Sequence, residues 1–331
     1  MEVHRLVQTV LRAHLAQPDY RAWAELTVRL LFDAFPSALD DLAAPPNWPR
    51  CEQLLPHIYA AAARAEDAHV ATVMTAELLM RLGSYLQHRG EYAEAASLCE
   101  RALVLIEGER AGDSLAVAHV LNALGYVRRA GGDLDGARLA HARALRIMHA
   151  ALPPDHEEVG RTLNSYGRVL YEQKDLTGAR DNFDRALAII GASAPGQPEE
   201  ASIKNNIARI HYDRGDLVAA RTAHERALVI KESSPKFGPH HPSVAAILAG
   251  LGRVLAGQLE LEAAKRALER ARTIQEDELG DHPDLVTTLH DLATVLDAIG
   301  QVEEARSARE RLEEISATLL ARPPRRRLLV D

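Results

Sequence analysis

Apolar residues along the chain follow the period of an α-helix within a unit that recurs several times. The segment GDLDGARLAHARALRI, which begins at Gly132, has near-copies that begin at Gly90, Lys174 and Gly215. In the Gly132 copy the apolar stripe consists of Leu134, Ala137, Leu145 and Ile147. A repeated helical pattern predicts one structural unit that is used several times.

Small residues mark the same position of each unit. They recur every 41 to 44 residues, at Gly83, Gly125, Gly167, Ala208, Gly252 and Ala293. An alanine stands twelve residues after each of them, at Ala95, Ala137, Ala179, Ala220, Ala264 and Ala305. Glycine inside a helix costs about 1 kcal/mol relative to alanine. Its recurrence therefore predicts a close approach of two helices, with the alanine across the contact.

Each unit is predicted to contain a turn between two helices. The first helix is expected to end in a left-handed residue at Gly90, Gly132, Gly215 and Gly300. The second helix is expected to be N-capped by Asp133, Asp175 and Asp216. Lys174 and Leu259 replace the glycine in two copies, so the turns of those copies are expected to differ.

The pattern resembles the tetratricopeptide repeat in its 42-residue form, as seen in kinesin light chains. The loop signature of that form is matched by the sequences PPDHEEVG, GPHHPSVA and GDHPDLV, at 153–160, 238–245 and 280–286. The resemblance covers six copies over residues 67–320. It implies an all-α, right-handed superhelical solenoid of helical hairpins with a concave surface. Residues 321–331 follow as a basic tail with three consecutive arginines.

Residues 1–66 do not fit the repeat and form a predicted N-terminal helical segment. An amphipathic helix is predicted from Val3, Leu6, Val7, Val10 and Leu11. Further helices are expected over 20–35 and 50–65, separated by a connection with Pro45, Pro46 and Pro49.

The amino-acid sequence of the N-terminal segment also suggests a larger parent protein. VHRLVQTVLRAHL and WPRCEQLLPHI resemble the junction between the winged helix and the repeats of bacterial STAND signalling ATPases of the NB-ARC type. No G-x-x-x-x-G-K-[ST] motif occurs, so the nucleotide-binding part would belong to the parent and not to this chain. The resemblance implies the C-terminal sensor portion of such an ATPase, whose own nucleotide-binding domain would be a partner. The alternative is a helical cap on a free-standing adaptor.

Composition narrows the function classes. A net charge of −8 argues against wholesale nucleic-acid binding. The sequence has no apolar run of about 18 residues, so no membrane span is predicted. The two cysteines lie in unrelated contexts, which fits a reducing, cytoplasmic setting. No catalytic or metal-ligand constellation stands out among the fifteen histidines and the acidic pairs. We expect a non-enzymatic, monomeric module without cofactor or metal.

Differences between the copies indicate where a ligand binds. The resemblance implies that the first helix of each hairpin lines the concave face, and four positions three or four residues apart share one side of it. Asparagines on this side, suited to a peptide backbone, are Asn122, Asn164 and Asn205. Tyrosines that offer apolar area are Tyr126, Tyr171 and Tyr212. Arginines suited to acidic groups are Arg129, Arg161, Arg168, Arg209 and Arg253. These residues predict a groove for a peptide or protein that bears an acidic group. A structural role for the asparagines is the alternative.

One arginine is common to all six copies. It stands eighteen residues after the small residue, at Arg101, Arg143, Arg185, Arg226, Arg270 and Arg311. A position that never varies serves the repeat itself. We interpret this arginine as a structural ion-pairing or helix-packing residue.

Overall fold

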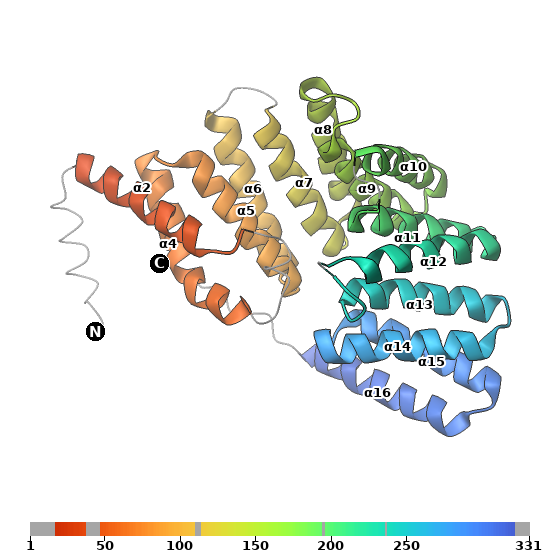
Figure 1. Cartoon of the computed structure of the whole chain (residues 1–331). Helices are drawn as coiled ribbons and strands as arrows, with labels where there is room; N and C mark the ends of the chain where they lie inside the picture. The colour runs from red at the N-terminus through yellow and green to blue at the C-terminus, as the bar shows by residue number, and fades with distance from the viewer. Residues whose placement is uncertain (1–16, 38–46, 110–113, 194–195, 236, 322–331) are drawn as a thin grey trace. The chain divides into compact units, whose positions relative to one another are not determined.

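Every regular element in the described part of the chain is an α-helix (Figure 1). The computed structural model describes residues 17–37, 47–109, 114–193, 196–235 and 237–321. These residues contain 14 helices and no strand, which confirms the all-α prediction. The helix expected from Val3 lies outside the described residues, as does the tail that follows residue 321.

The chain divides into two compact units, which meet in sequence between Ala151 and Leu152. The helices of the first unit are α2 (Gln17–Ala34), α4 (Trp48–Ala68), α5 (Thr72–His88), α6 (Tyr92–Glu109), α7 (Leu115–Ala130) and α8 (Leu134–Ala151). The helices α2 and α4 pack against each other and against α5. They lie where two N-terminal helices were predicted, with ends that differ by up to three residues.

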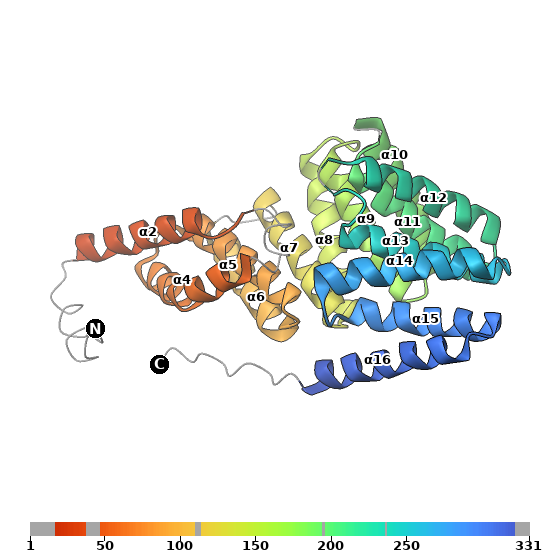
Figure 2. The ribbon, with the colours of Figure 1, turned by 60° about the horizontal axis from the view of Figure 1, so that its bottom comes forward.

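The second unit holds the remaining helices. They are α9 (Glu157–Glu172), α10 (Leu176–Ser193), α11 (Pro198–Asp213), α12 (Leu217–Ser233), α13 (Pro242–Gly257), α14 (Leu261–Leu279), α15 (Pro283–Ile299) and α16 (Val302–Ala321). Consecutive helices pack as hairpins in both units, and the hairpins of the second unit follow one another as successive pairs (Figure 2). The six hairpins coincide with the six predicted copies.

Glycine lets the two helices of a hairpin approach closely, as predicted. A Cβ atom added at Gly125 would lie 2.6 Å from Nε2 of His141, and one added at Gly167 would lie 2.7 Å from the Phe183 ring. The nearest side chain thus stands sixteen residues after the small residue, which corrects the expectation that the alanine faces it at Gly125 and Gly167. At Gly83 the predicted Ala95 also lies across the contact, with its backbone oxygen 3.1 Å from the place of a Cβ atom. The alanines stand four residues, about one helical turn, before this contacting side chain. They are fully buried in the close-packed interior of the hairpin.

The turns inside the hairpins are more uniform than the sequence indicates. Gly90, Gly132, Gly215 and Gly300 have φ values between 79° and 90°. Lys174 and Leu259 adopt the same left-handed conformation, at 67° and 63°, so the prediction that their turns differ is wrong. The reason is the shared hydrogen bonding: the residue after the left-handed one donates its N–H to a first-helix carbonyl at 2.9 Å in each of these two turns, as it does after Gly132.

The second helices are capped as predicted. Oδ1 of Asp133, Asp175 and Asp216 accepts the backbone N–H three residues on, at 2.9, 2.9 and 3.0 Å. Histidines cap three first helices in a similar way: Nδ1 of His156, His241 and His282 accepts the backbone N–H two residues on. The loop histidines therefore have a structural role at the starts of α9, α13 and α15.

We expect Leu259→Gly to raise the free energy of unfolding by up to about 1 kcal/mol, because a left-handed residue with a Cβ atom costs about 1–2 kcal/mol and the glycine's greater freedom when unfolded offsets part of the gain. The side chain is 82% exposed, so little packing is lost. Urea unfolding of the variant measures the change. Gly215→Ala at the equivalent turn is the control and should lower the stability. A loss of stability in Leu259→Gly would contradict the strain argument.

Candidate peptide-binding surface

Predicted ligand-binding positions meet on one side of the first helices of the second unit. The guanidinium of Arg209 on α11 lies 4.3 Å from the centre of the Tyr171 ring on α9. In the next pair of helices Arg253 on α13 lies 6.0 Å from the Tyr212 ring on α11. The tyrosine of one repeat therefore contacts the arginine of the next. We call the side that carries Asn164, Tyr171, Asn205, Arg209, Tyr212 and Arg253 the first-helix face.

The asparagines of this face have different surroundings. Oδ1 of Asn164 accepts a hydrogen bond from Nδ2 of the buried Asn206 on the next first helix, at 3.0 Å. Oδ1 of Asn205 is buried and has no hydrogen-bond partner in the described part of the chain. A buried acceptor without a donor costs free energy. Asn164 thus joins two repeats, as the alternative structural role predicts, while the Oδ1 of Asn205 has no donor in the described part of the chain.

The charges of the face are partly compensated. Nε of Arg253 lies 3.6 Å from Oδ2 of Asp291 on α15, and Arg161 on α9 pairs with Glu157 at 2.5 Å. Arg209 has no ion pair within the described residues. Arg168 lies half-buried on α9. The positive charge of the face is therefore smaller than the five predicted arginines alone indicate, and Arg209 is a member without an ion pair in the described part of the chain.

Two titratable side chains near Arg209 and Arg253, Tyr171 and His224, are uncharged at pH 7. Burial raises the pKa of Tyr171, and its hydrogen bond to Asp213 adds to this effect. His224 on α12 is almost fully buried. Burial, with Arg253 and Arg209 nearby, lowers the pKa of His224 to about 3. The imidazole is therefore neutral at pH 7 and adds no charge to the face.

Three of the predicted residues lie in the first unit. Asn122, Tyr126 and Arg129 are on α7, where Oδ1 of Asn122 is buried without a hydrogen-bond partner among the described residues. The Tyr126 ring contacts the His141 ring edge-on, with centroids 5.7 Å apart. The first unit therefore carries its own short copy of the pattern, with an asparagine and a tyrosine on one helix.

Some residues near the first-helix face were not identified from the sequence. Asn206 and His224 could have been found as polar residues at positions that the repeat pattern predicts to be buried. His141 stands at the position of the second repeat that His224 occupies in the fourth. Asp291 shows no such signal, because its role depends on Arg253 of the preceding repeat.

The described residues show no sign of two other kinds of functional feature, a metal site and a membrane-spanning helix. Nowhere in them do three or more histidine, cysteine or acidic side chains gather as metal ligands. None of their helices combines the length and apolarity that crossing a bilayer requires.

A family model for the tetratricopeptide repeat matches residues 74–150, 158–233 and 199–277, together more than half of the chain. The chain belongs to the tetratricopeptide repeat family. Repeats of this family form protein–protein interaction modules, and the hairpins described above are its structural unit. The matches fall on the hairpins, and the boundary at residue 66 remains a prediction.

Solved structures share this fold at low sequence identity. Aspartyl phosphate phosphatase F from Bacillus subtilis matches with a TM-score of 0.66 and 15% identity, over 95% of this chain and 76% of that one. A Rap protein complexed with Competence and Sporulation Factor matches with 0.62 and 14%, over 91% and 77%. A putative kinesin light chain of Podosopora anserina matches with 0.50 and 20%, over 64% and 100%. A search of the curated proteins gives no match.

Proposed function

We propose that the first-helix face binds a segment of a protein partner that carries an acidic side chain. The observation that carries this proposal is the stack of Arg209 on Tyr171, in which the guanidinium is held in place and has no ion pair within the described residues. The nearby carboxylate of Asp213 is hydrogen-bonded to Tyr171. An arginine held by an aromatic ring loses less freedom on binding a carboxylate than a mobile one.

Neighbouring groups extend the site along the ligand. Asn205 is half-buried on the same helix as Arg209, and its Oδ1 has no hydrogen-bond partner in the described part of the chain. It accepts a backbone N–H of the bound segment when the side chain turns outward. The ring of Tyr212, which is 36% exposed, provides apolar contact. Arg253 lies 6.0 Å from the centre of that ring, so a ligand extending from α9 to α13 would meet a second arginine. The similar fold of the Rap protein that is complexed with Competence and Sporulation Factor supports a binding role for such an array.

We further propose that the module is the sensor portion of a STAND-type ATPase, with an adaptor of the same fold as the alternative. The resemblance of the N-terminal sequence to the junction in STAND ATPases supports the sensor proposal. The reading frame upstream of residue 3 separates the two. A P-loop there supports the sensor, and a stop codon or an unrelated start supports the adaptor.

We expect Asn205→Ala and Arg209→Ala each to weaken binding of the partner by about 1–3 kcal/mol, roughly 5- to 150-fold, because each removes a hydrogen-bonding group of the first-helix face. The partner is first captured from an extract of the native cells with the intact chain, and its affinity for each variant is then measured by calorimetry. Arg209→Ala should also reduce the salt dependence of the affinity, since the attraction between charges is screened by salt.

The control is Arg266→Ala, which removes the same charge from an exposed position on α14. It should leave affinity and salt dependence unchanged. If Asn205→Ala and Arg209→Ala bind as tightly as the original chain, the partner does not use the first-helix face.

A further inference from the structure

In four repeats the common arginine forms an ion pair with an acid that precedes its hairpin. Arg143 on α8 lies 2.7 Å from Glu107 on α6, and Arg270 on α14 lies 2.6 Å from Glu232 on α12. Arg101 and Arg311 pair with Glu66 and Asp281, at 2.7 and 2.9 Å. The interpretation as a structural ion pair is confirmed at these four positions. In each case the carboxylate comes from the chain before the hairpin that holds the arginine.

The fourth repeat lacks this carboxylate. Glu107 and Glu232 both stand 24 residues after the small residue of their repeat, and Gly191 occupies that position in the third repeat. The second repeat has His149 there, so Arg185 of the third repeat also lacks this carboxylate. No atom lies within 4 Å of the place where a Cβ atom of Gly191 would be. Arg226 on α12, which would be its partner, has no ion pair and no hydrogen bond within the described residues. The chain thus keeps the arginine and omits the acid.

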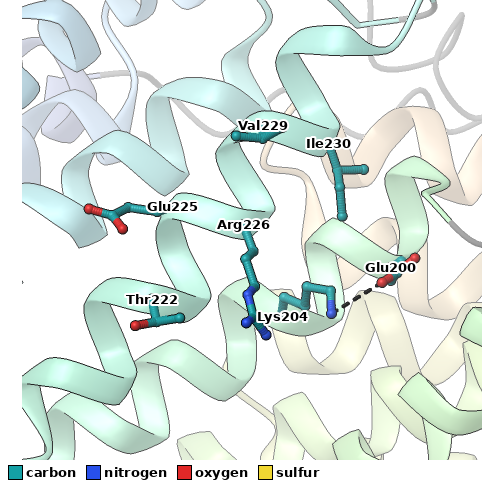
Figure 3. A pocket seen from close by; sticks show the side chains of 7 residues that line it. All are labelled: Glu200, Lys204, Thr222, Glu225, Arg226, Val229 and Ile230. Carbon is teal, nitrogen blue, oxygen red and sulfur yellow. Dashed lines mark ion pairs between the residues drawn. The ribbon is translucent and has the colours of Figure 1, made fainter.

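Arg226 lines an open pocket between α11 and α12 with a volume of about 500 Å³. Figure 3 shows its side chain extending toward Lys204. The two acids of the pocket have partners: Glu200 pairs with Lys204 at 3.1 Å, and Glu225 pairs with Arg221 at 2.8 Å. Arg226 is therefore the charged residue of the pocket that has no ion pair within the described residues.

Apolar groups lie beside this charge. Val229 and Ile230 line the same pocket, and Val229 is 66% exposed. Thr222 and Val229 are seven residues apart on α12, so they share the side of the helix on which Arg226 also lies. A binding surface needs such apolar area, because an exposed ion pair alone contributes about 0–1 kcal/mol.

We infer that the Arg226 pocket binds a carboxylate side chain of a protein partner, with an adjacent apolar side chain against Val229 and Ile230. The partner's carboxylate takes the place that Glu107 and Glu232 take beside the equivalent arginines. The guanidinium can bind both of its oxygens. This site lies between α11 and α12 and does not depend on the function proposed for the first-helix face.

The test uses a blocked tripeptide, acetyl-Leu-Glu-Leu-amide, and the full chain. The side-chain Nε–Hε signal of Arg226 is followed by NMR during the titration and is assigned by its loss in Arg226→Gln. We expect a saturable shift of this signal. The same peptide with glutamine in place of glutamate should bind about tenfold more weakly or not at all, because it lacks the charge. Inorganic phosphate is titrated separately, since a phosphate group could also bind a guanidinium.

Gly191→Glu provides the decisive variant. It introduces the acid that Glu107 and Glu232 provide at the equivalent position. We expect its carboxylate to pair with Arg226 and to weaken binding of the peptide about tenfold or more by competition. Gly191→Gln is the matched control, with a side chain of the same size and no charge, and it should leave peptide binding intact. Arg209→Ala should leave it intact as well, which separates this site from the first-helix face.

Three results would overturn the inference. They are the absence of a saturable shift with the glutamate peptide, an equal response to the glutamine peptide, and equal binding by Gly191→Glu and Gly191→Gln. A response of Arg226 to phosphate alone would assign the pocket to phosphate groups and would also overturn it.

Discussion

Replacing Gly125 with leucine should lower the free energy of unfolding by about 3 kcal/mol, because overfilling a packed core typically costs 1–3 kcal/mol or more. Even the first carbon of the new side chain would lie 2.6 Å from the fully buried ring of His141. The ring belongs to the other helix of the hairpin, so α7 and α8 must separate to make room. Urea unfolding followed by circular dichroism measures the change.

Gly108→Ala is the control for this substitution. Gly108 lies near the end of α6, and no atom lies within 4 Å of the place of its Cβ atom. We expect Gly108→Ala to raise the free energy of unfolding by less than about 1 kcal/mol, because alanine has a higher helix propensity than glycine. An unchanged unfolding midpoint for Gly125→Leu would show that the helices of this hairpin do not meet at Gly125.

The second large effect concerns pH. The folded-state pKa of His224, about 3, lies below the ordinary value because the ring is buried and Arg253 and Arg209 are near. Only the unfolded chain then binds a proton at His224 as the pH falls below about 6.5. The contribution of the neutral ring to stability is therefore complete above pH 6.5 and declines toward pH 3. Between pH 7 and pH 5 the loss is about 2 kcal/mol.

We expect His224→Leu to remove this part of the pH dependence. Leucine occupies the same position in the fifth repeat, as Leu268, and packs there beside Gly252. The difference in unfolding free energy between the original chain and the variant isolates His224, because the other titrating groups are common to both. His240→Leu makes the same change at an exposed loop position and should keep the original slope. Equal slopes for His224→Leu and the original chain would mean that His224 is not buried in a neutral form.

The hairpins could be predicted because each depends on contacts within some forty residues. The spacing of the small residues placed the close contacts, and the aspartates placed the second helices. The turns at Lys174 and Leu259 were predicted wrongly, because the sequence rule concerns the preference of one residue. The hydrogen bonds of the whole turn outweigh that preference and hold both residues at positive φ.

The candidate site was less predictable, because it depends on contacts between repeats. The alignment placed Tyr171 and Arg209 on the same side of their helices but did not show that one stacks on the other. It also could not show that Asn164 is bonded to Asn206, or that Asp291 lies beside Arg253. The unpaired Arg226 has a signal in the sequence, since Gly191 stands where three other repeats carry a glutamate.

Site-specific photo-crosslinking is the most direct measurement of where a protein partner binds. A benzophenone amino acid replaces Tyr212 on the first-helix face in one variant and Leu259, an exposed turn residue of the same unit, in another. We expect the captured partner to crosslink at position 212 and not at position 259, through a segment that contains an aspartate or glutamate. Crosslinks at position 259 with none at position 212 would show that the partner binds elsewhere and would contradict binding at the first-helix face.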